Sequence, residues 1–187
     1  MDNEIKLLIT DFDGTLVDTF EANYNAYNKA FESVGYSLSR SDYRKCFGMR
    51  FDSFMGSIGV SDSGDREKIK DLKAEFYPDY FNFLKLNRPL VEFIRLFHKQ
   101  GGKTAIASTA RGKNLNNVLE HFGLKADFDL ILAGEHVKEG KPNPEIYNTV
   151  LSITEVKPEN ALVFEDSEIG CKAAAAAGIA FIKVKQF

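Results

Sequence analysis

Two aspartates one residue apart follow a short apolar stretch near the amino terminus. The residues from Ile5 to Ile9 predict a strand buried on both faces, which is typical of parallel sheets covered by helices. Asp11 and Asp13 then lie at or just beyond the carboxyl end of this strand, where open α/β sheets bind their ligands. Two such carboxylates stay ionised only if a cation or hydrogen-bond donors compensate their charge. The pair therefore predicts a cation site, although Asp13-Gly14 is also a common hairpin turn.

Polar residues also follow the other predicted strands. Ser108 and Thr109 follow the second strand, Lys141 lies in the loop after the third, and Glu165 and Asp166 follow the fourth. The spacing of apolar residues places helices between the strands, which indicates βαβ crossovers and a parallel sheet. Parallel strands bring these side chains to one edge of the sheet. The strands after the first are predicted at 103–107, 130–133, 161–164 and 180–184.

This combination of acids, hydroxyls and one lysine favours phosphoryl chemistry. Hard oxygen ligands with excess negative charge suit Mg²⁺, which leaves room for a substrate phosphate. A carboxylate can attack phosphorus and form an aspartyl-phosphate if the metal and a lysine neutralise the incoming dianion. A second carboxylate can protonate the leaving alkoxide and then take a proton from water. Backbone N–H groups of the Asp13-Gly14 turn and the Ser108 hydroxyl would hold the phosphoryl oxygens.

The segment from about Phe20 to Leu86 has helical spacing without another convincing strand, which predicts an inserted helical subdomain. We therefore expect an α/β fold with a Rossmann-like parallel sheet of about five strands flanked by helices. Residues 1–19 and 87–187 would form this core, and residues 20–86 would form a helical cap.

Composition excludes several classes of protein. The 187 residues carry a net charge of −3 with a pI near 5.7, so there is no basic field for nucleic acid. Cys46 and Cys171 show no metal-binding or disulfide pattern. No stretch is apolar enough to span a membrane, and the amino terminus does not resemble a signal peptide. We expect a soluble, cytoplasmic protein that is a monomer or weak homodimer and binds neither nucleic acid nor membrane.

Four sequence motifs in order resemble those of the haloacid dehalogenase superfamily over nearly the whole chain. They are DFDGTLVDT, AIASTAR, GKPNPEIY and VFEDS with the following AAAAAG. Each motif alone has an ordinary explanation as a turn, a helix cap or a solvated charge. Four in order, each after a predicted strand, are a strong signal. The resemblance is to the branch with a helical cap after the first motif, which contains small-metabolite phosphatases and β-phosphoglucomutase.

The resemblance implies a role for each catalytic candidate. It implies Asp11 as nucleophile, Asp13 as general acid/base, Ser108 as the phosphate-binding hydroxyl and Lys141 as the cation that bridges nucleophile and phosphate. Dehalogenases of the same superfamily lack the second aspartate of the first motif, so Asp13 favours phosphoryl transfer.

The resemblance also implies Mg²⁺ held by Asp11, the main-chain carbonyl of Asp13, and Asp166. Glu165 is then either a further metal ligand or an outer-shell partner. We expect Gly14 and Thr109 to contribute to substrate binding.

Substrate choice is expected to lie in the cap. Arg50, in FGMRFDSF, occupies the place where related enzymes often carry an arginine that reaches a substrate phosphate or carboxylate, but it can equally be a solvated charge between helices. No histidine lies near Asn23, where β-phosphoglucomutases carry one. We expect an Mg²⁺-dependent phosphatase acting on a small, sugar-phosphate-like metabolite. A phosphomutase and a non-catalytic phosphate-binding module are the alternatives.

Overall fold

The computed structural model describes residues 4–185 and 187. Contacts divide the chain into two compact units, of which unit 1 comprises Met1–Asp18 and Leu86–Phe187 and unit 2 comprises Thr19–Lys85. Two short strands, β2 (Val17–Asp18) and β3 (Lys85–Leu86), pair where the chain passes between the units. In the described part of the chain, every helix is too short or too polar to cross a lipid bilayer.

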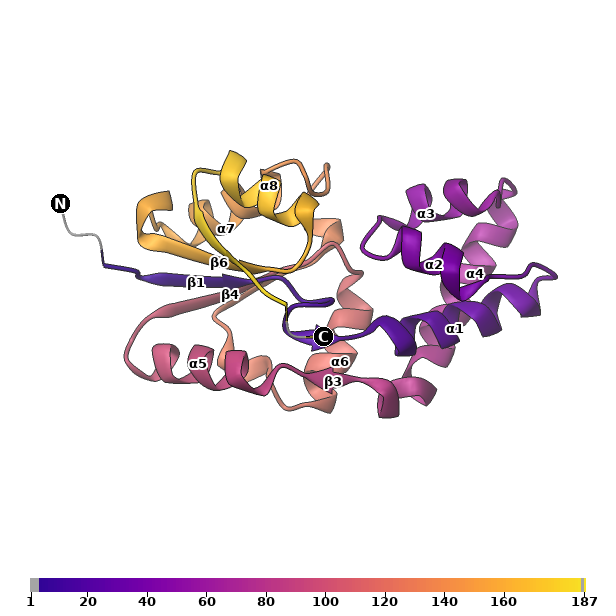
Figure 1. The fold of residues 1–187 in the computed structure, drawn as a ribbon, viewed down its shortest axis with the longest axis horizontal. Coiled ribbons are helices and arrows are strands. Elements are labelled where there is room, and N and C mark those ends of the chain that lie inside the picture. The colour runs from indigo at the N-terminus through magenta and orange to yellow at the C-terminus, as the bar shows by residue number, and fades with distance from the viewer. Residues whose placement is uncertain (1–3, 186) are drawn as a thin grey trace. The chain divides into compact units, whose positions relative to one another are not determined.

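Unit 1 is built on a five-stranded sheet in the order β5-β4-β1-β6-β7, with every pair of neighbours parallel (Figure 1). β1 lies at the centre of this order, and its four residues are all buried, as expected for a strand covered on both faces. The predicted α/β class and parallel sheet are confirmed. The strands are β1 (Leu7–Thr10), β4 (Lys103–Ala107), β5 (Leu130–Leu132), β6 (Ala161–Glu165) and β7 (Ala180–Lys183).

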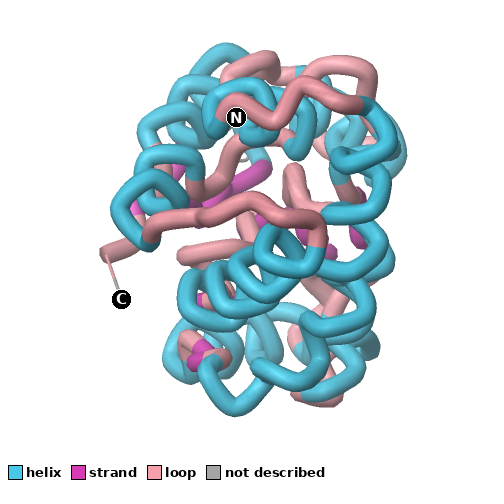
Figure 2. Tube along the Cα trace, turned by 90° about the vertical axis from the view of Figure 1, so that its right-hand side faces the viewer, coloured by secondary structure: helices cyan, strands magenta, loops and turns pink. Residues whose placement is uncertain are grey.

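Helices cover both faces of the sheet, as is usual for a buried parallel sheet. Figure 1 shows α7 and α8 on one face and α5 and α6 on the other, and Figure 2 shows the strands lying among helices. Under α7 and α8, apolar residues of β1 and β6 join Tyr147 and small alanines in one buried cluster. The helices are α5 (Arg88–Lys99), α6 (Gly112–His121), α7 (Glu145–Thr154) and α8 (Glu168–Ala176), with 3-10 segments at Lys125–Asp127, Gly134–His136 and Pro158–Asn160.

Local sequence signals set the ends of these helices. Pro89 lies in the first turn of α5, and the Asn87 side chain caps that turn by accepting the Leu90 N–H at 3.3 Å. Beyond α5, Gly101 takes a positive φ of 90°, a conformation that favours glycine. At α8, the Ser167 hydroxyl accepts the Gly170 N–H at 3.0 Å. The side chains of Asn87 and Ser167 thereby fix where the chain turns from β3 into α5 and from β6 into α8.

The α5 side of β6 and β7 is only partly covered. β7 is an edge strand whose residues are all exposed. Phe164 faces α5, where its ring lies 5.9 Å from that of Phe93, and Ile182 pairs in register with Phe164. Phe93, Leu96 and Ile182 all remain partly open to solvent. The core of unit 1 is therefore densest around β1, β4 and α7 rather than at this edge.

Unit 2 is a helical bundle with an aromatic core. The ring of Tyr43 lies 5.3 to 6.0 Å from five neighbouring rings, those of Phe20, Tyr24, Tyr27, Phe47 and Phe54. Lys73 is buried in this unit, with its ammonium group 3.6 Å from the centre of the Tyr77 ring. The helices are α1 (Phe20–Ser33), α2 (Arg40–Cys46), α3 (Phe51–Ile58), α4 (Ser63–Phe76) and the 3-10 helix η1 (Tyr77–Phe83).

Two substitutions on α5 should separate the core-facing side of this helix from its open side. Ile94 is 2% exposed and Leu96 is 56% exposed. Ile94→Ala should lower the free energy of unfolding by about 2–5 kcal/mol because it leaves a cavity against the sheet. Leu96→Ala should change it by no more than about 0.5 kcal/mol. Urea unfolding of both variants measures the difference, and equal losses would contradict the described packing.

Candidate active site

Three carboxylates meet at the carboxyl end of the sheet. β1 and β6 are paired so that Thr10 lies opposite Phe164, and the Asp11 N–H donates to the Phe164 carbonyl at 2.9 Å. The next residues of both strands are therefore neighbours. Oxygen atoms of Asp11, Glu165 and Asp166 lie within 4.8 Å of one another. The expected gathering of these acids by parallel strand ends is thus present in unit 1.

Lys141 places its ammonium group among these acids. Its Nζ lies 2.7 Å from Asp11 Oδ1 and 2.5 Å from Glu165 Oε1, and it donates to the main-chain carbonyl of Ala107 at 2.9 Å. The side chain is only 3% exposed. An ammonium group has three protons, and each has an acceptor here. The position of Lys141 is therefore defined by β4, β6 and the residue that follows β1.

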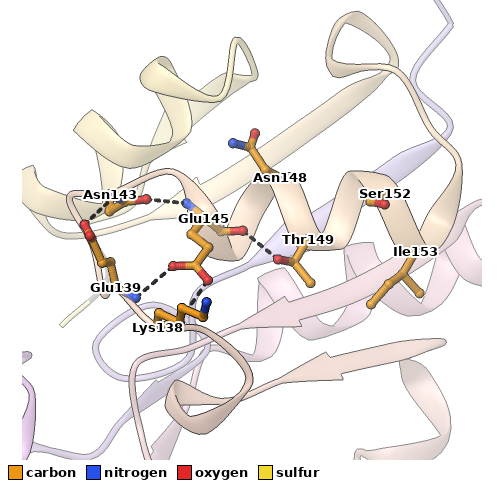
Figure 3. Close-up of a pocket in the computed structure, with 8 residues that line it drawn as sticks. All are labelled: Lys138, Glu139, Asn143, Glu145, Asn148, Thr149, Ser152 and Ile153. Atoms are coloured by element: carbon orange, nitrogen blue, oxygen red, sulfur yellow. Dashed lines mark hydrogen bonds between the residues drawn. The ribbon is translucent and has the colours of Figure 1, made fainter.

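The loop between β5 and α7, which carries Lys141, is held by a hydrogen-bond network of its own residues and Glu145 (Figure 3). The Glu145 carboxylate accepts the N–H groups of Lys138 at 3.0 Å and Glu139 at 2.8 Å. Asn143 accepts the Glu145 N–H at 2.9 Å and donates to the Glu139 carboxylate at 2.6 Å. These bonds tie the loop to the first turn of α7. The hollow drawn in Figure 3 lies beside this network and is not lined by the acid cluster.

Glu165 and Asp166 are held very differently. Glu165 is completely buried, and both of its oxygens are occupied. Oε1 accepts from Lys141 and from the Tyr147 hydroxyl at 2.8 Å, while Oε2 accepts the Ser167 hydroxyl at 3.0 Å and N–H at 3.3 Å. Asp166 is partly exposed, and its Oδ1 accepts the Thr15 hydroxyl at 2.8 Å. Asp166 therefore retains more capacity for an added ligand than Glu165 does.

The charges in this cluster are not balanced. Three carboxylates face one ammonium group, an excess of two formal negative charges. Burial alone would lower the pKa of Lys141, but the charges of Asp11 and Glu165 raise it well above its ordinary value, so Lys141 stays protonated. Burial raises the pKa of Asp11 well above its usual range and also raises that of Asp166. A divalent cation bound by oxygen ligands fits this donor set and would remove the excess charge.

The turn after Asp11 approaches Asp166 closely. Asp13 is partly exposed and lies two residues beyond Asp11. Gly14 has a φ of 89°, and a Cβ atom at this position would lie 2.5 Å from Asp166 Oδ2. The Gly14 N–H, which we expected to bind phosphate, instead donates to the Val17 carbonyl at 2.8 Å. The absence of a side chain at Gly14 therefore lets the backbone of this turn pack against Asp166, and the Gly14 N–H is already bonded to Val17.

The loop after β4 carries the two hydroxyl candidates. Ser108 is buried, and its Oγ accepts the Ala110 N–H at 3.0 Å, which leaves the hydroxyl proton to donate to another group. Thr109 is partly exposed, and Gly134 allows its carbonyl to pack closely, since a Cβ there would lie 2.5 Å from the Thr109 oxygen. Arg50 belongs to unit 2, where it immediately precedes α3, and its role remains a prediction.

Four further residues support the acids and were not predicted from the sequence. Thr15 holds Asp166, whereas Tyr147, Ser167 and Gly170 all contact Glu165. Tyr147 had a sequence signal only as part of the apolar face of a helix, which predicts burial but not a hydroxyl partner. Ser167 could have been recognised as a helix cap, because it precedes an alanine-rich helix.

Comparisons with known proteins identify the family. The model of the family described as "Haloacid dehalogenase-like hydrolase" matches residues 8–184. The chain belongs to this family. It is 32% identical to the "Phosphorylated carbohydrates phosphatase" of Thermotoga maritima, over 94% of this chain and 82% of that protein. The expectations of family and of an enzyme related to phosphatases are confirmed.

Two solved structures place the fold in the same family. One is a CbbY mutant from Rhodobacter sphaeroides in complex with xylulose-(1,5)bisphosphate, at 27% identity and a TM-score of 0.89. The other is a putative β-phosphoglucomutase from Thermotoga maritima, at 31% identity and a TM-score of 0.75. Each alignment covers 98% of this chain and 87% of the other.

Replacing Gly170 by alanine should disturb the acid cluster. A Cβ at Gly170 would lie 1.9 Å from Glu165 Oε1, so the buried carboxylate would have to move. We expect Gly170→Ala to lower the free energy of unfolding by about 1–3 kcal/mol, the usual cost of overpacking.

Gly56 provides the matched control, because it is also helical and nothing lies within 4 Å of a Cβ there. Gly56→Ala should be neutral or stabilise by up to about 1 kcal/mol. Thermal and urea unfolding compare the two, and a neutral Gly170→Ala would refute the close contact with Glu165.

Proposed function

We propose that the chain is an Mg²⁺-dependent phosphatase that hydrolyses a small, sugar-phosphate-like metabolite through an aspartyl-phosphate on Asp11. The observation that carries this proposal is the buried contact between Lys141 and Asp11, inside a cluster with excess negative charge. A carboxylate beside a fixed ammonium group can approach a phosphate dianion with less repulsion. The names of the relatives support the reaction type, since they include a phosphatase of phosphorylated carbohydrates.

In the first half-reaction, an Asp11 oxygen forms a bond to phosphorus as the bond from phosphorus to the leaving oxygen breaks. Asp13 donates a proton to that leaving oxygen. Lys141 neutralises charge at Asp11 and on the phosphoryl group, and the Ser108 hydroxyl donates to a phosphoryl oxygen. Thr109 lies beside Ser108 and is proposed to contact the substrate.

In the second half-reaction, Asp13 takes a proton from a water molecule that attacks phosphorus. The bond between phosphorus and the Asp11 oxygen breaks, and inorganic phosphate leaves. Asp11, Asp166 and the main-chain carbonyl of Asp13 would hold Mg²⁺, which supplies charge neutralisation for the phosphoryl oxygens when bound. We assign Glu165 an outer-shell role, because both of its oxygens are already engaged by protein donors.

We further propose that unit 2 acts as the cap that selects the substrate, and that Arg50 binds a phosphate or carboxylate group of the substrate. Gly14 is proposed to shape the substrate side of the turn by its close approach to Asp166. A phosphomutase remains the second candidate, because the chain is similar to a putative β-phosphoglucomutase. The residue near the cap hinge is Asn23 rather than histidine, which favours the phosphatase. The presence of both Asp11 and Asp13 opposes a module that only binds phosphate.

Turnover of phosphate esters tests this function. With Mg²⁺, the parent protein should release phosphate from p-nitrophenyl phosphate and from members of a sugar-phosphate panel. Asp11→Asn should lower kcat at least about a thousandfold because the nucleophile is lost. Glu159→Gln, which removes one exposed acid beside the amino end of β6, should leave kcat unchanged. Isomerised esters without free phosphate would favour the mutase, and no turnover at all would favour the binding module.

Metal binding should be visible as stabilisation that depends on pH. Saturating Mg²⁺ should raise Tm by about 5 °C at pH 7.5. The rise should shrink toward pH 5, because the raised pKa values of Asp11 and Asp166 mean that both carboxyls take up protons at a higher pH than usual and then compete with the metal. Asp166→Asn should remove most of the rise, and Glu159→Gln should retain it. An equal rise in both variants would exclude Asp166 as a ligand.

A further inference from the structure

Tyr147 carries a buried hydroxyl that the proposed reaction does not use. It lies on α7 and is completely buried in the core between α7, α8 and the sheet. Its hydroxyl donates to Glu165 Oε1 at 2.8 Å, and its ring lies 5.1 Å from the Lys141 ammonium group. Packing alone would be served equally well by phenylalanine, so the hydroxyl calls for a separate explanation.

Glu165 Oε1 is shared between two donors. It accepts from the Tyr147 hydroxyl and from Lys141 at 2.5 Å. The other oxygen of Glu165 is held by Ser167, and the carboxylate packs against the backbone of Gly170. Four protein donors therefore hold the Glu165 carboxylate, and the Tyr147 hydroxyl is one of them.

The three groups that accept hydrogen bonds from Lys141 differ in how firmly the protein holds them. The Ala107 carbonyl belongs to β4, and Glu165 is fixed by its own partners, so these two acceptors are rigid. The third acceptor is Asp11, the proposed nucleophile. The two rigid acceptors thus determine where the ammonium group lies relative to the nucleophile. Without the Tyr147 hydroxyl, Oε1 would lose one of its two donors, and Glu165 could draw Lys141 away from Asp11.

We propose that Tyr147 is a positioning residue, which acts through Glu165 to hold the Lys141 ammonium group against Asp11. This inference rests on the proposed function. In this role, the Tyr147 hydroxyl keeps the positive charge of Lys141 beside the proposed nucleophile Asp11. Displacement of a catalytic group by about 1 Å can lower the rate as much as a hundredfold.

The test is Tyr147→Phe, which removes the hydroxyl and keeps the ring. We expect kcat for the best substrate of the panel to fall about tenfold, while KM changes less than about twofold, because Tyr147 acts on Lys141 rather than on the substrate. Thr154→Val is the matched control, since it removes another buried hydroxyl of α7, one that donates to the Val150 and Leu151 carbonyls of its own helix. Its kcat should be that of the parent. An unchanged kcat in Tyr147→Phe would overturn the proposal.

A double-mutant cycle identifies the route of the effect. In a Glu165→Gln background, Tyr147→Phe should lower kcat by less than about twofold, because the carboxylate that it positions is already gone. The same tenfold loss in both backgrounds would show that Tyr147 does not act through Glu165 and would refute the inference.

A crystal structure of Tyr147→Phe keeps the inference separate from the proposed function. The distance from Lys141 Nζ to Asp11 Oδ1 should lengthen beyond about 3.5 Å, the limit of a hydrogen bond. An unchanged distance would overturn the positioning role even in an active enzyme. A parent protein without turnover on any ester would refute the proposed function alone, and the distance would still decide the role of Tyr147.

Discussion

The buried contact of Lys141 with Asp11 and Glu165 is the interaction on which the rest of unit 1 depends. Removing these charges from water is costly, and only close geometry with full hydrogen bonding can offset that cost. Loss of one partner of a buried ion pair typically destabilises a protein by about 3–5 kcal/mol, because the remaining charge is uncompensated. The strands β1 and β6 and the loop before α7 must therefore meet in one arrangement, which makes the fold and the site parts of the same constraint.

The same cluster divides its acids by their surroundings. Both oxygens of Glu165 are held by protein donors, whereas burial, together with the neighbouring Glu165 carboxylate, raises the pKa values of Asp11 and Asp166. The two neighbouring carboxylates of VFEDS thus have different hydrogen-bond surroundings, although their sequence positions are adjacent. Their difference arises from Tyr147 and Ser167 on one side and from Thr15 on the other.

The sequence predicted the sheet because buried parallel strands are short apolar runs, and the strand at 103–107 matches the structure residue for residue. Asp11, Lys141, Glu165 and Asp166 were found because parallel strands bring their carboxyl ends together. The first strand begins at Leu7 rather than at Ile5, and the two-residue strands β2 and β3 lack any periodic signal. Partners such as Tyr147 could not be predicted, because helical spacing indicates burial without specifying which atoms meet.

The central place of β1 also determines the order in which the protein can fold. Leu7 pairs with Lys103 on one side and with Ala161 on the other, so β1 has both of its neighbours only after β6 has been synthesised. Unit 2 is continuous in sequence and can complete its own contacts earlier. Such long-range pairing slows folding, since loop closure precedes the gain in contacts. On the ribosome, β1 can pair with β4 first and gains its second neighbour only when β6 emerges, so the acids after β1 and β6 meet late in synthesis.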